Sequence, residues 1–246
     1  MITKRNLSPS VQNNLKKAKV FWAFLERFAP KVRRILLWGP PGTGKSSLAY
    51  KSMGANVERV YLTSDSPSAE IRGHYIINDN TTQWHDGPAI RAWKRGAGFL
   101  IEEIDQANPE IYSLLMGILD DTSVAKLTLP SGEEVHPEPG FSVIATTNYD
   151  PKVLPLPLLD RFDSIQEVVY PNPSIIDALP DRLQRPAIND LFGGGTTRAL
   201  STRGWIRLGE LSQAIGLKDA ARIITPTNGA ALYDAIKIAS KNGNRS

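Results

Sequence analysis

One segment of this 246-residue chain constrains its fold more than any other, and it covers residues 35–47, Ile-Leu-Leu-Trp-Gly-Pro-Pro-Gly-Thr-Gly-Lys-Ser-Ser. The first four residues are apolar and predict a short buried strand. The run that follows has the spacing of a phosphate-binding P-loop: a glycine, four residues, then Gly-Lys-Ser. Glycines let the backbone curl so that its N–H groups face an anion, and the next helix directs its positive end at the same phosphates. The segment therefore predicts a strand, a nucleotide-binding loop and a helix.

The P-loop pattern assigns a role to each polar group near its end. Lys45 can reach the β- and γ-phosphates of a nucleotide, and the Ser46 hydroxyl can ligate Mg²⁺. A plain Gly/Pro-rich surface turn is the alternative, but it needs no strand before it and no helix after it. We therefore expect ATP or ADP with Mg²⁺ as ligands, and we expect nucleotide contacts from Gly39, Pro40, Pro41, Gly42, Thr43, Gly44, Lys45, Ser46 and Ser47.

A second apolar segment ends in acidic residues, Gly-Phe-Leu-Ile-Glu-Glu-Ile-Asp at positions 98–105. An apolar strand of this kind is typical of the middle of a parallel sheet, where both faces are covered. Open α/β sheets bind ligands at the carboxyl ends of their strands, where these acids would lie. From their positions, Glu102 would hold Mg²⁺ directly or through water, and Glu103 would orient and activate the attacking water. The alternative is a strand that ends in solvated acids.

The rest of the chain predicts a parallel sheet flanked by helices and followed by a small helical subdomain. Composition shifts at Pro171-Asn172-Pro173, so residues 1–170 are assigned to an α/β core and residues 171–246 to a helical lid. The core would include an N-terminal helix, an insertion over residues 64–86 and a β-hairpin around Pro130-Ser131-Gly132. Residues 241–246 are expected to be disordered. The expected strands cover residues 57–62, 141–147 and 165–170, and the expected helices residues 8–29, 44–53 and 87–95 with another beginning at Pro109.

Composition excludes several classes of protein. The chain has no cysteine, which rules out disulfides and thiolate metal sites. It has no apolar run of membrane-spanning length and no secretory apolar stretch near its start, so the cytoplasm is the expected location. A net charge of +4 permits nucleic-acid binding, but the basic residues are spread along the chain rather than clustered.

Several of these segments occur in the order found in a known family. The segments at residues 39–46, 84–93, 99–105, 141–148, 160–162 and 201–203 together resemble an AAA+ ATPase, and the chain is most similar to the MoxR branch with its CbbQ- and NorQ-type activators. The resemblance covers residues 32–240. It is most specific in Asp-Gly-Pro-Ala-Ile before the acidic strand, in the insertion and in the hairpin before the strand that ends at Asn148.

The resemblance implies roles for three further residues. Asn148 matches the sensor that helps to orient the water, and Arg161 matches the arginine finger that acts on the nucleotide of a neighbouring subunit. Arg203 matches the second sensor, on the lid. Taken singly, Asn148 could instead cap a strand end, and the two arginines could form surface ion pairs. The family usually has Asp before the catalytic Glu, where this chain has Glu102, so the longer side chain would ligate Mg²⁺ through water or slow hydrolysis.

The resemblance also implies a homo-oligomeric ring, most often a hexamer, that uses ATP to remodel or activate a protein client. The client of such relatives commonly carries a von Willebrand A domain. A nucleic-acid motor of the same fold is the alternative, disfavoured by the spread charge and by Glu133 and Glu134 in the predicted hairpin. A third possibility is a nucleotide-gated scaffold that scarcely hydrolyses ATP, suggested by Glu102.

Overall fold

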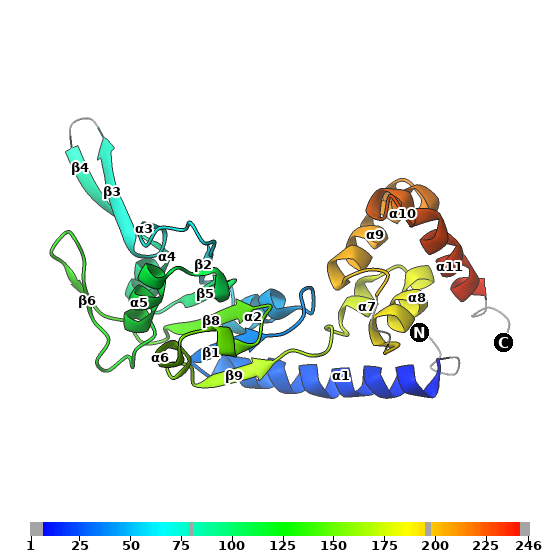
Figure 1. Ribbon diagram of the computed structural model, residues 1–246, viewed down its shortest axis with the longest axis horizontal. Helices are drawn as coiled ribbons and strands as arrows, with labels where there is room; N and C mark the ends of the chain where they lie inside the picture. Colours follow the sequence, from blue (N-terminus) through cyan, green and yellow to red (C-terminus); the bar gives the residue numbers. More distant parts are fainter. Residues whose placement is uncertain (1–6, 79–80, 195–197, 242–246) are drawn as a thin grey trace. The chain divides into compact units, whose positions relative to one another are not determined.

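The computed structural model describes residues 7–78, 81–194 and 198–241, which form two compact units (Figure 1). The larger unit holds residues 25–40 and 45–168, and the smaller one holds the described residues before 25, residues 41–44 and those from 169 onward. The sequence placed the N-terminal helix wholly in the core, whereas the structure groups its first part with the C-terminal helices. The functional names core and lid remain predictions.

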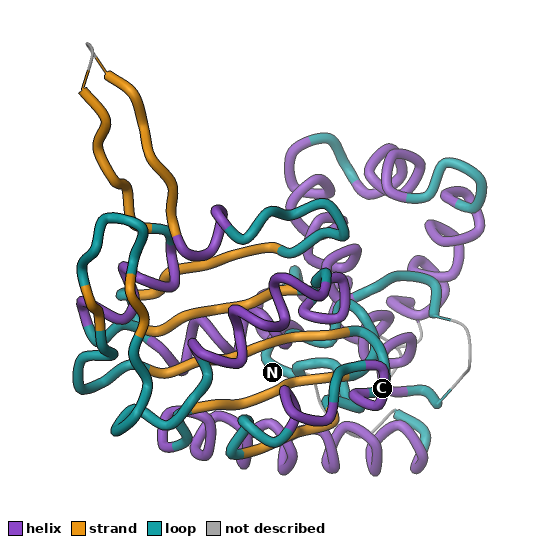
Figure 2. Tube along the Cα trace, turned by 60° about the vertical axis from the view of Figure 1, so that its left-hand side comes forward, coloured by secondary structure: helices purple, strands orange, loops and turns teal. Residues whose placement is uncertain are grey.

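A parallel sheet of five strands forms the centre of the larger unit, in the order β2-β5-β8-β1-β9 (Figure 1 and Figure 2). The three inner strands, β5, β8 and β1, are short and mainly buried because both faces are covered, whereas the edge strands β2 and β9 carry charged and polar residues and are partly exposed. This arrangement confirms the predicted α/β fold. The strands are β1 (Arg34–Trp38), β2 (Val57–Tyr61), β5 (Gly98–Glu102), β8 (Ser142–Thr147) and β9 (Ser164–Glu167).

The strand register places the carboxyl ends of β1, β5 and β8 at the same end of this sheet. Trp38 at the end of β1 pairs with Thr147 at the end of β8, and Glu102 at the end of β5 pairs with Tyr61 at the end of β2. The P-loop follows β1, and Asn148 follows β8. The P-loop and the polar residues predicted to act with it therefore lie at the carboxyl ends of the strands, where α/β sheets bind ligands.

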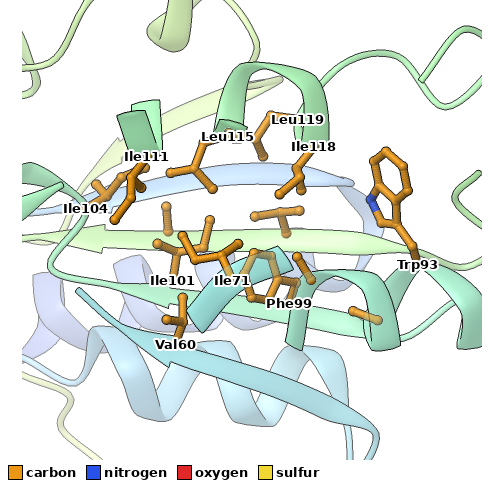
Figure 3. Close-up of a cluster of buried hydrophobic side chains, with 14 of the residues drawn as sticks. Val60, Ile71, Trp93, Phe99, Ile101, Ile104, Ile111, Leu115, Ile118 and Leu119 are labelled. Atoms are coloured by element: carbon orange, nitrogen blue, oxygen red, sulfur yellow. The ribbon is translucent and has the colours of Figure 1, made fainter. Parts of the chain in front are cut away.

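Local capping and apolar spacing explain the helices of the larger unit. In α5, Pro109 takes the first position and the Asn108 side chain accepts a hydrogen bond from the Ile111 N–H at 3.0 Å. Ile111 and Leu115 lie one turn apart, and both are fully buried in the apolar cluster that also contains Phe99 (Figure 3). The helices are α2 (Lys45–Met53), α3 (Ala69–Arg72), α4 (Pro88–Arg95), α5 (Pro109–Ile118) and α6 (Leu156–Leu159), with short 3-10 turns at Ala29–Lys31, Ile104–Gln106 and Pro151–Val153.

The predicted insertion contains an antiparallel hairpin, which Figure 2 shows extending away from the parallel sheet. Its strands are β3 (Gly73–Asn78) and β4 (Thr81–Asp86). Tyr75 lies opposite Trp84, and their rings meet edge to face with centroids 5.2 Å apart. The sequence predicted the insertion but not these strands, because polar residues dominate it. The second hairpin, predicted around Pro130-Ser131-Gly132, is present and short, with β6 at Leu127–Thr128 and β7 at Glu134–Val135.

Helices form the smaller unit, as predicted for the C-terminal part of the chain. The first part of α1 buries Val11 and Ala18 in the same apolar cluster as Trp205 and Leu208 of α9. The Trp22 indole N–H donates to the Tyr170 carbonyl at 2.9 Å. These contacts explain why the start of α1 belongs to this unit. Besides the first part of α1 (Pro9–Phe28), its helices are α7 (Ile175–Ala178), α8 (Asp181–Phe192), α9 (Thr202–Ala214), α10 (Leu217–Ile224) and α11 (Gly229–Lys241).

Two expectations cannot be compared with this fold. Disorder was predicted for residues 241–246, but Lys241 is the last residue of α11, and residues 242–246 fall outside the described residues. The cytoplasmic location stays a prediction. Within the described part of the chain, no helix combines the length and the hydropathy that crossing a membrane requires.

Candidate functional site

The glycine-rich loop after β1 has the backbone conformation that a P-loop needs. Gly39, Gly42 and Gly44 have φ angles of +131°, +72° and +110°, a region in which residues with a side chain are strained. A Cβ atom at Gly39 would also lie 2.8 Å from the Val168 carbonyl oxygen. Helix α2 then begins at Lys45, so its first N–H groups lie directly after the curled loop.

Lys45 is held inside this loop rather than in solvent. Its side chain is 7% exposed, and its Nζ donates to the carbonyl oxygens of Gly39 at 2.8 Å and Pro40 at 3.1 Å. A third bond, of 2.9 Å, runs to Oδ1 of Asn148. Burial lowers the pKa of Lys45 to about 8, although the nearby charges of Glu103 and Asp105 act to raise it. A poorly solvated ammonium group of this kind gains strongly from an incoming anion.

Asn148 joins Lys45 to Glu103. Its amide Nδ2 donates to both carboxylate oxygens of Glu103, at 2.8 Å and 3.0 Å. Burial raises the pKa of Glu103, the charge of Asp105 adds to that effect, and the bond from Asn148 opposes it. A carboxylate with a raised pKa is a better proton acceptor near neutral pH. The structure thus joins three predicted residues in one hydrogen-bonded chain, Lys45–Asn148–Glu103.

Glu103 also has an unusual backbone. Among the described residues it is the one non-glycine residue with a positive φ, at φ 55° and ψ 49°. Such a left-handed conformation costs energy in a residue with a side chain, and it is often found at functional sites. Glu103 follows directly after β5, and its side chain contacts Asn148, whereas that of Glu102 contacts Ser46 and Arg59.

Ser46 and Glu102 meet as a pair of oxygen donors. The Ser46 hydroxyl donates to Oε2 of Glu102 at 3.0 Å. Hydroxyl and carboxylate oxygens are ligands that Mg²⁺ accepts, usually together with waters and the phosphates of a bound nucleotide. The described residues hold no cluster of three or more acidic or histidine side chains that would bind a metal ion on its own. The donor set therefore fits an Mg²⁺ ion that arrives with a nucleotide.

Three further residues at this site, Arg59, Thr147 and Asp105, were not predicted from the sequence. Arg59 on β2 forms an ion pair with Glu102, from Nε to Oε1 at 2.7 Å. The Thr147 hydroxyl donates to a carboxylate oxygen of Asp105, whose charge acts on both Lys45 and Glu103. Asp105 belongs to the acidic run that the sequence displayed. Arg59 could be found only from the pairing of β2 with β5.

The two predicted arginines are not part of this hydrogen-bonded group. Arg161 is partly exposed, and its guanidinium donates to the carbonyl oxygens of Met116 at 2.7 Å and Pro157 at 2.8 Å. Arg203 is exposed in the first turn of α9, in the smaller unit, where the Ser201 hydroxyl caps the helix by accepting from the Gly204 N–H at 3.1 Å. Their predicted roles remain predictions.

Comparison with known proteins identifies related sequences and folds. Residues 34–162 match the family described as an AAA domain of the dynein-related subfamily. Protein NorQ of Paracoccus denitrificans is 31% identical over 130 residues, which are 51% of this chain and 47% of that protein. An uncharacterized protein of Staphylococcus saprophyticus is 38% identical over 125 residues, 47% of each chain. The matched region thus spans about half the length of these curated relatives.

Solved structures support the fold. NtrX from Brucella abortus in complex with ADP aligns with a TM-score of 0.52 at 14% sequence identity, covering 97% of this chain and 64% of NtrX. At that identity the likeness concerns the fold alone. The family match and the NorQ relative confirm the resemblance to AAA+ ATPases of the MoxR branch that the sequence motifs indicated.

Proposed function

This chain belongs to the AAA domain family of the dynein-related subfamily, and we propose that it hydrolyses ATP with Mg²⁺ at the interfaces of a homo-oligomeric ring. The proposal rests on the hydrogen bonds that link Lys45 to Asn148 and Asn148 to Glu103. They connect the P-loop with a carboxylate of raised pKa. A buried cation for phosphate and a basic carboxylate for water are two of the groups that ATP hydrolysis requires from the protein.

The proposed reaction follows from what each group can do. The loop N–H groups and the Lys45 ammonium hold the β- and γ-phosphates. The water oxygen bonds to the γ-phosphorus as the bond from that phosphorus to the bridging oxygen breaks, which releases ADP and phosphate. Glu103 accepts a proton from the attacking water, and Asn148 orients the Glu103 carboxylate for that transfer. Bound at Ser46 and Glu102, Mg²⁺ would supply positive charge for the phosphate oxygens. Arg161, lent by a neighbouring subunit, would stabilise the charge that develops on the transferred phosphoryl group.

We expect Lys45→Ala to weaken ATP binding by on the order of 100-fold, because a charged contact with the phosphates is lost. A fluorescent, non-hydrolysable ATP analogue measures the affinity. The control is Lys51→Ala, in the same helix, since the Lys51 side chain is 64% exposed and pairs with Glu26 at 2.8 Å. Unchanged affinity in Lys45→Ala would exclude the P-loop assignment.

We further propose that the ring acts on a protein client, of which a von Willebrand A-domain protein is the expected kind. The β3–β4 hairpin supports this proposal, because it presents Tyr75, Ile76 and Ile77 with 46%, 38% and 77% exposure. Exposed apolar side chains on an extended hairpin suit contact with a polypeptide. They do not suit contact with a phosphate backbone, which basic groups bind.

Substitutions in the β3–β4 hairpin are expected to impair client activation and to leave ATP hydrolysis largely unchanged. Replacing both Ile76 and Ile77 with Ser should impair client activation while ATP turnover without client stays within a few-fold of wild type, because neither residue belongs to the hydrogen-bonded group around Lys45. Val153→Ser is the control, since Val153 is 58% exposed and lies outside the hairpin. Pull-down and activation of a von Willebrand A-domain partner measure the effect. Normal activation by the double variant would remove the hairpin from client contact.

A nucleic-acid motor is the competing function. In the sequence, Glu133 and Glu134 disfavoured it because they would repel a phosphate backbone, but in the structure both acids have basic neighbours. Lys94 pairs with Glu133 at 2.9 Å, and Lys126 pairs with Glu134 at 3.4 Å, so neighbouring lysines offset both acids. The exposed apolar hairpin still favours a protein client. Strong stimulation of wild-type ATP turnover by single- or double-stranded DNA at physiological salt would select the motor instead.

A nucleotide-gated scaffold is favoured by one observation, the engagement of both carboxylate oxygens of Glu102 by Arg59 and Ser46. Tight ATP binding without measurable turnover in the wild type would select it.

A further inference from the structure

Glu102 is held from two sides, and the two contacts divide its carboxylate. Oε2 accepts the hydroxyl of Ser46 at 3.0 Å, on the side of the P-loop. Oε1 pairs with the Nε of Arg59 at 2.7 Å, on the side of β2. The Glu102 side chain is 13% exposed, whereas that of Arg59 is 50% exposed. One oxygen thus faces the predicted metal ligand Ser46, while an arginine from the neighbouring strand occupies the other.

The sheet makes this arrangement possible. β2 and β5 pair in parallel with Tyr61 opposite Glu102, so Arg59 lies two residues before the position opposite Glu102, on the same face of β2 as Tyr61. A long arginine side chain reaches forward along the strand to the end of β5. A glutamate extends one methylene further than an aspartate and has one more rotatable bond, so an anchor on Oε1 restricts the orientation of a side chain that would otherwise be freer.

The division of the carboxylate bears on which cation it can accept. Ca²⁺ takes six to eight oxygen ligands and readily binds both oxygens of one carboxylate. Mg²⁺ demands near-octahedral geometry and uses one oxygen of a carboxylate, or a water between them. With Arg59 on Oε1, a cation can reach Glu102 only at Oε2, where it would replace the hydrogen bond from Ser46. One carboxylate oxygen suits Mg²⁺ and denies Ca²⁺ the second contact.

We propose that Arg59 is a positioning residue that holds Glu102 for single-oxygen or water-mediated contact and so makes nucleotide binding selective for Mg²⁺ over Ca²⁺. The inference rests on the proposed Mg²⁺-dependent nucleotide site. Arg59 would then be a third contributor to the site, from β2, in addition to the P-loop and β5. It also gives the glutamate at position 102 a structural partner that compensates for its extra length.

The experiment measures metal selectivity without turnover. A fluorescent, non-hydrolysable ATP analogue is titrated into wild type and Arg59→Gln at graded Mg²⁺ or Ca²⁺, which gives the half-saturating concentration of each cation. Loss of the arginine charge should strengthen the binding of both divalent cations alike. The ratio of the two half-saturating concentrations therefore reports whether a cation gains contact with Oε1 of Glu102. We expect that ratio to move toward Ca²⁺ by roughly tenfold, the size of effect seen when groups that hold a metal ligand are removed.

Three further variants separate positioning from general effects. Arg95→Gln is the matched control, because Arg95 is also 50% exposed and pairs with Glu58 rather than with Glu102, and it should keep the wild-type ratio. Arg59→Lys retains a cationic donor and should restore most of the selectivity. Arg59→Ala should repeat the shift of Arg59→Gln. Since Arg59 is half exposed, its ion pair adds little to folding stability, and these variants should fold normally.

The outcomes are distinct. A wild-type ratio in both Arg59→Gln and Arg59→Ala contradicts the role of Arg59 and leaves the proposed nucleotide site intact. An equal shift in Arg95→Gln also contradicts it, since surface charge alone would then explain the change. Wild-type protein that binds the analogue with neither cation overturns the proposed function and this inference together.

Discussion

Replacing Glu103 with Gln is expected to leave ATP binding intact and to slow hydrolysis by about 10²- to 10⁴-fold, the usual contribution of a general base. Glutamine has nearly the same shape and can still accept a hydrogen bond from Asn148, but its amide cannot take a proton from water. The structure supports this role because Asn148 contacts both carboxylate oxygens of Glu103, and burial raises the pKa of that carboxylate.

Phosphate release under saturating ATP measures the rate, and the fluorescent ATP analogue measures binding in the same preparation. Glu110→Gln serves as a control, because Glu110 contacts Ser68 and lies outside the hydrogen-bonded group around Lys45. Normal hydrolysis by Glu103→Gln would show that another residue activates the water, and the assignment of Glu102 and Glu103 would then be wrong.

Arg161→Ala is expected to bind ATP normally and to lose hydrolysis by roughly 10³-fold or more, the effect of removing an arginine finger in related phosphoryl transfer. In the isolated chain the Arg161 guanidinium donates to the carbonyl oxygens of Met116 and Pro157. These bonds fix the direction of the side chain, which is the preparation that a group acting on a neighbour requires.

The same bonds mean that Arg161→Ala also removes local structure, so circular dichroism and ring assembly must be measured beside the rate. Arg33→Ala is the control, since Arg33 makes a comparable exposed bond to the Thr122 hydroxyl at 2.9 Å. Loss of hydrolysis in Arg161→Ala with intact ATP binding and assembly supports the finger. A fully active variant, or an active wild-type monomer at all concentrations, contradicts it.

The fold was predictable where the sequence carries strong local signals. The apolar strands before the P-loop and before Glu102, with helices predicted between the strands, indicated a covered parallel sheet, and the structure has one. The β3–β4 hairpin was not predicted as strands, because polar residues dominate its sequence and the contact of Tyr75 with Trp84 appears only once the strands are paired.

The site was predictable to the extent that it follows motifs. Lys45, Ser46, Glu102, Glu103 and Asn148 were all singled out, and the structure places them in two hydrogen-bonded sets. The contact of Asn148 with both Lys45 and Glu103 required the register of β1, β5 and β8, which no local pattern contains. Arg59 was missed for the same reason, since only the pairing of β2 with β5 brings it to Glu102.

The central claim is that each site takes Glu103 from one subunit and Arg161 from the next, and a mixing experiment tests it most directly. Glu103→Gln and Arg161→Ala proteins are each inactive, but a Glu103→Gln subunit can lend its Arg161 to a neighbour whose Glu103 is intact. If subunits mix at random in equal amounts, about one interface in four combines both intact residues. The account predicts that, on mixing, ATP hydrolysis averaged over all interfaces returns to roughly a quarter of the wild-type rate. A mixture that assembles into rings and stays as inactive as its two components would contradict it.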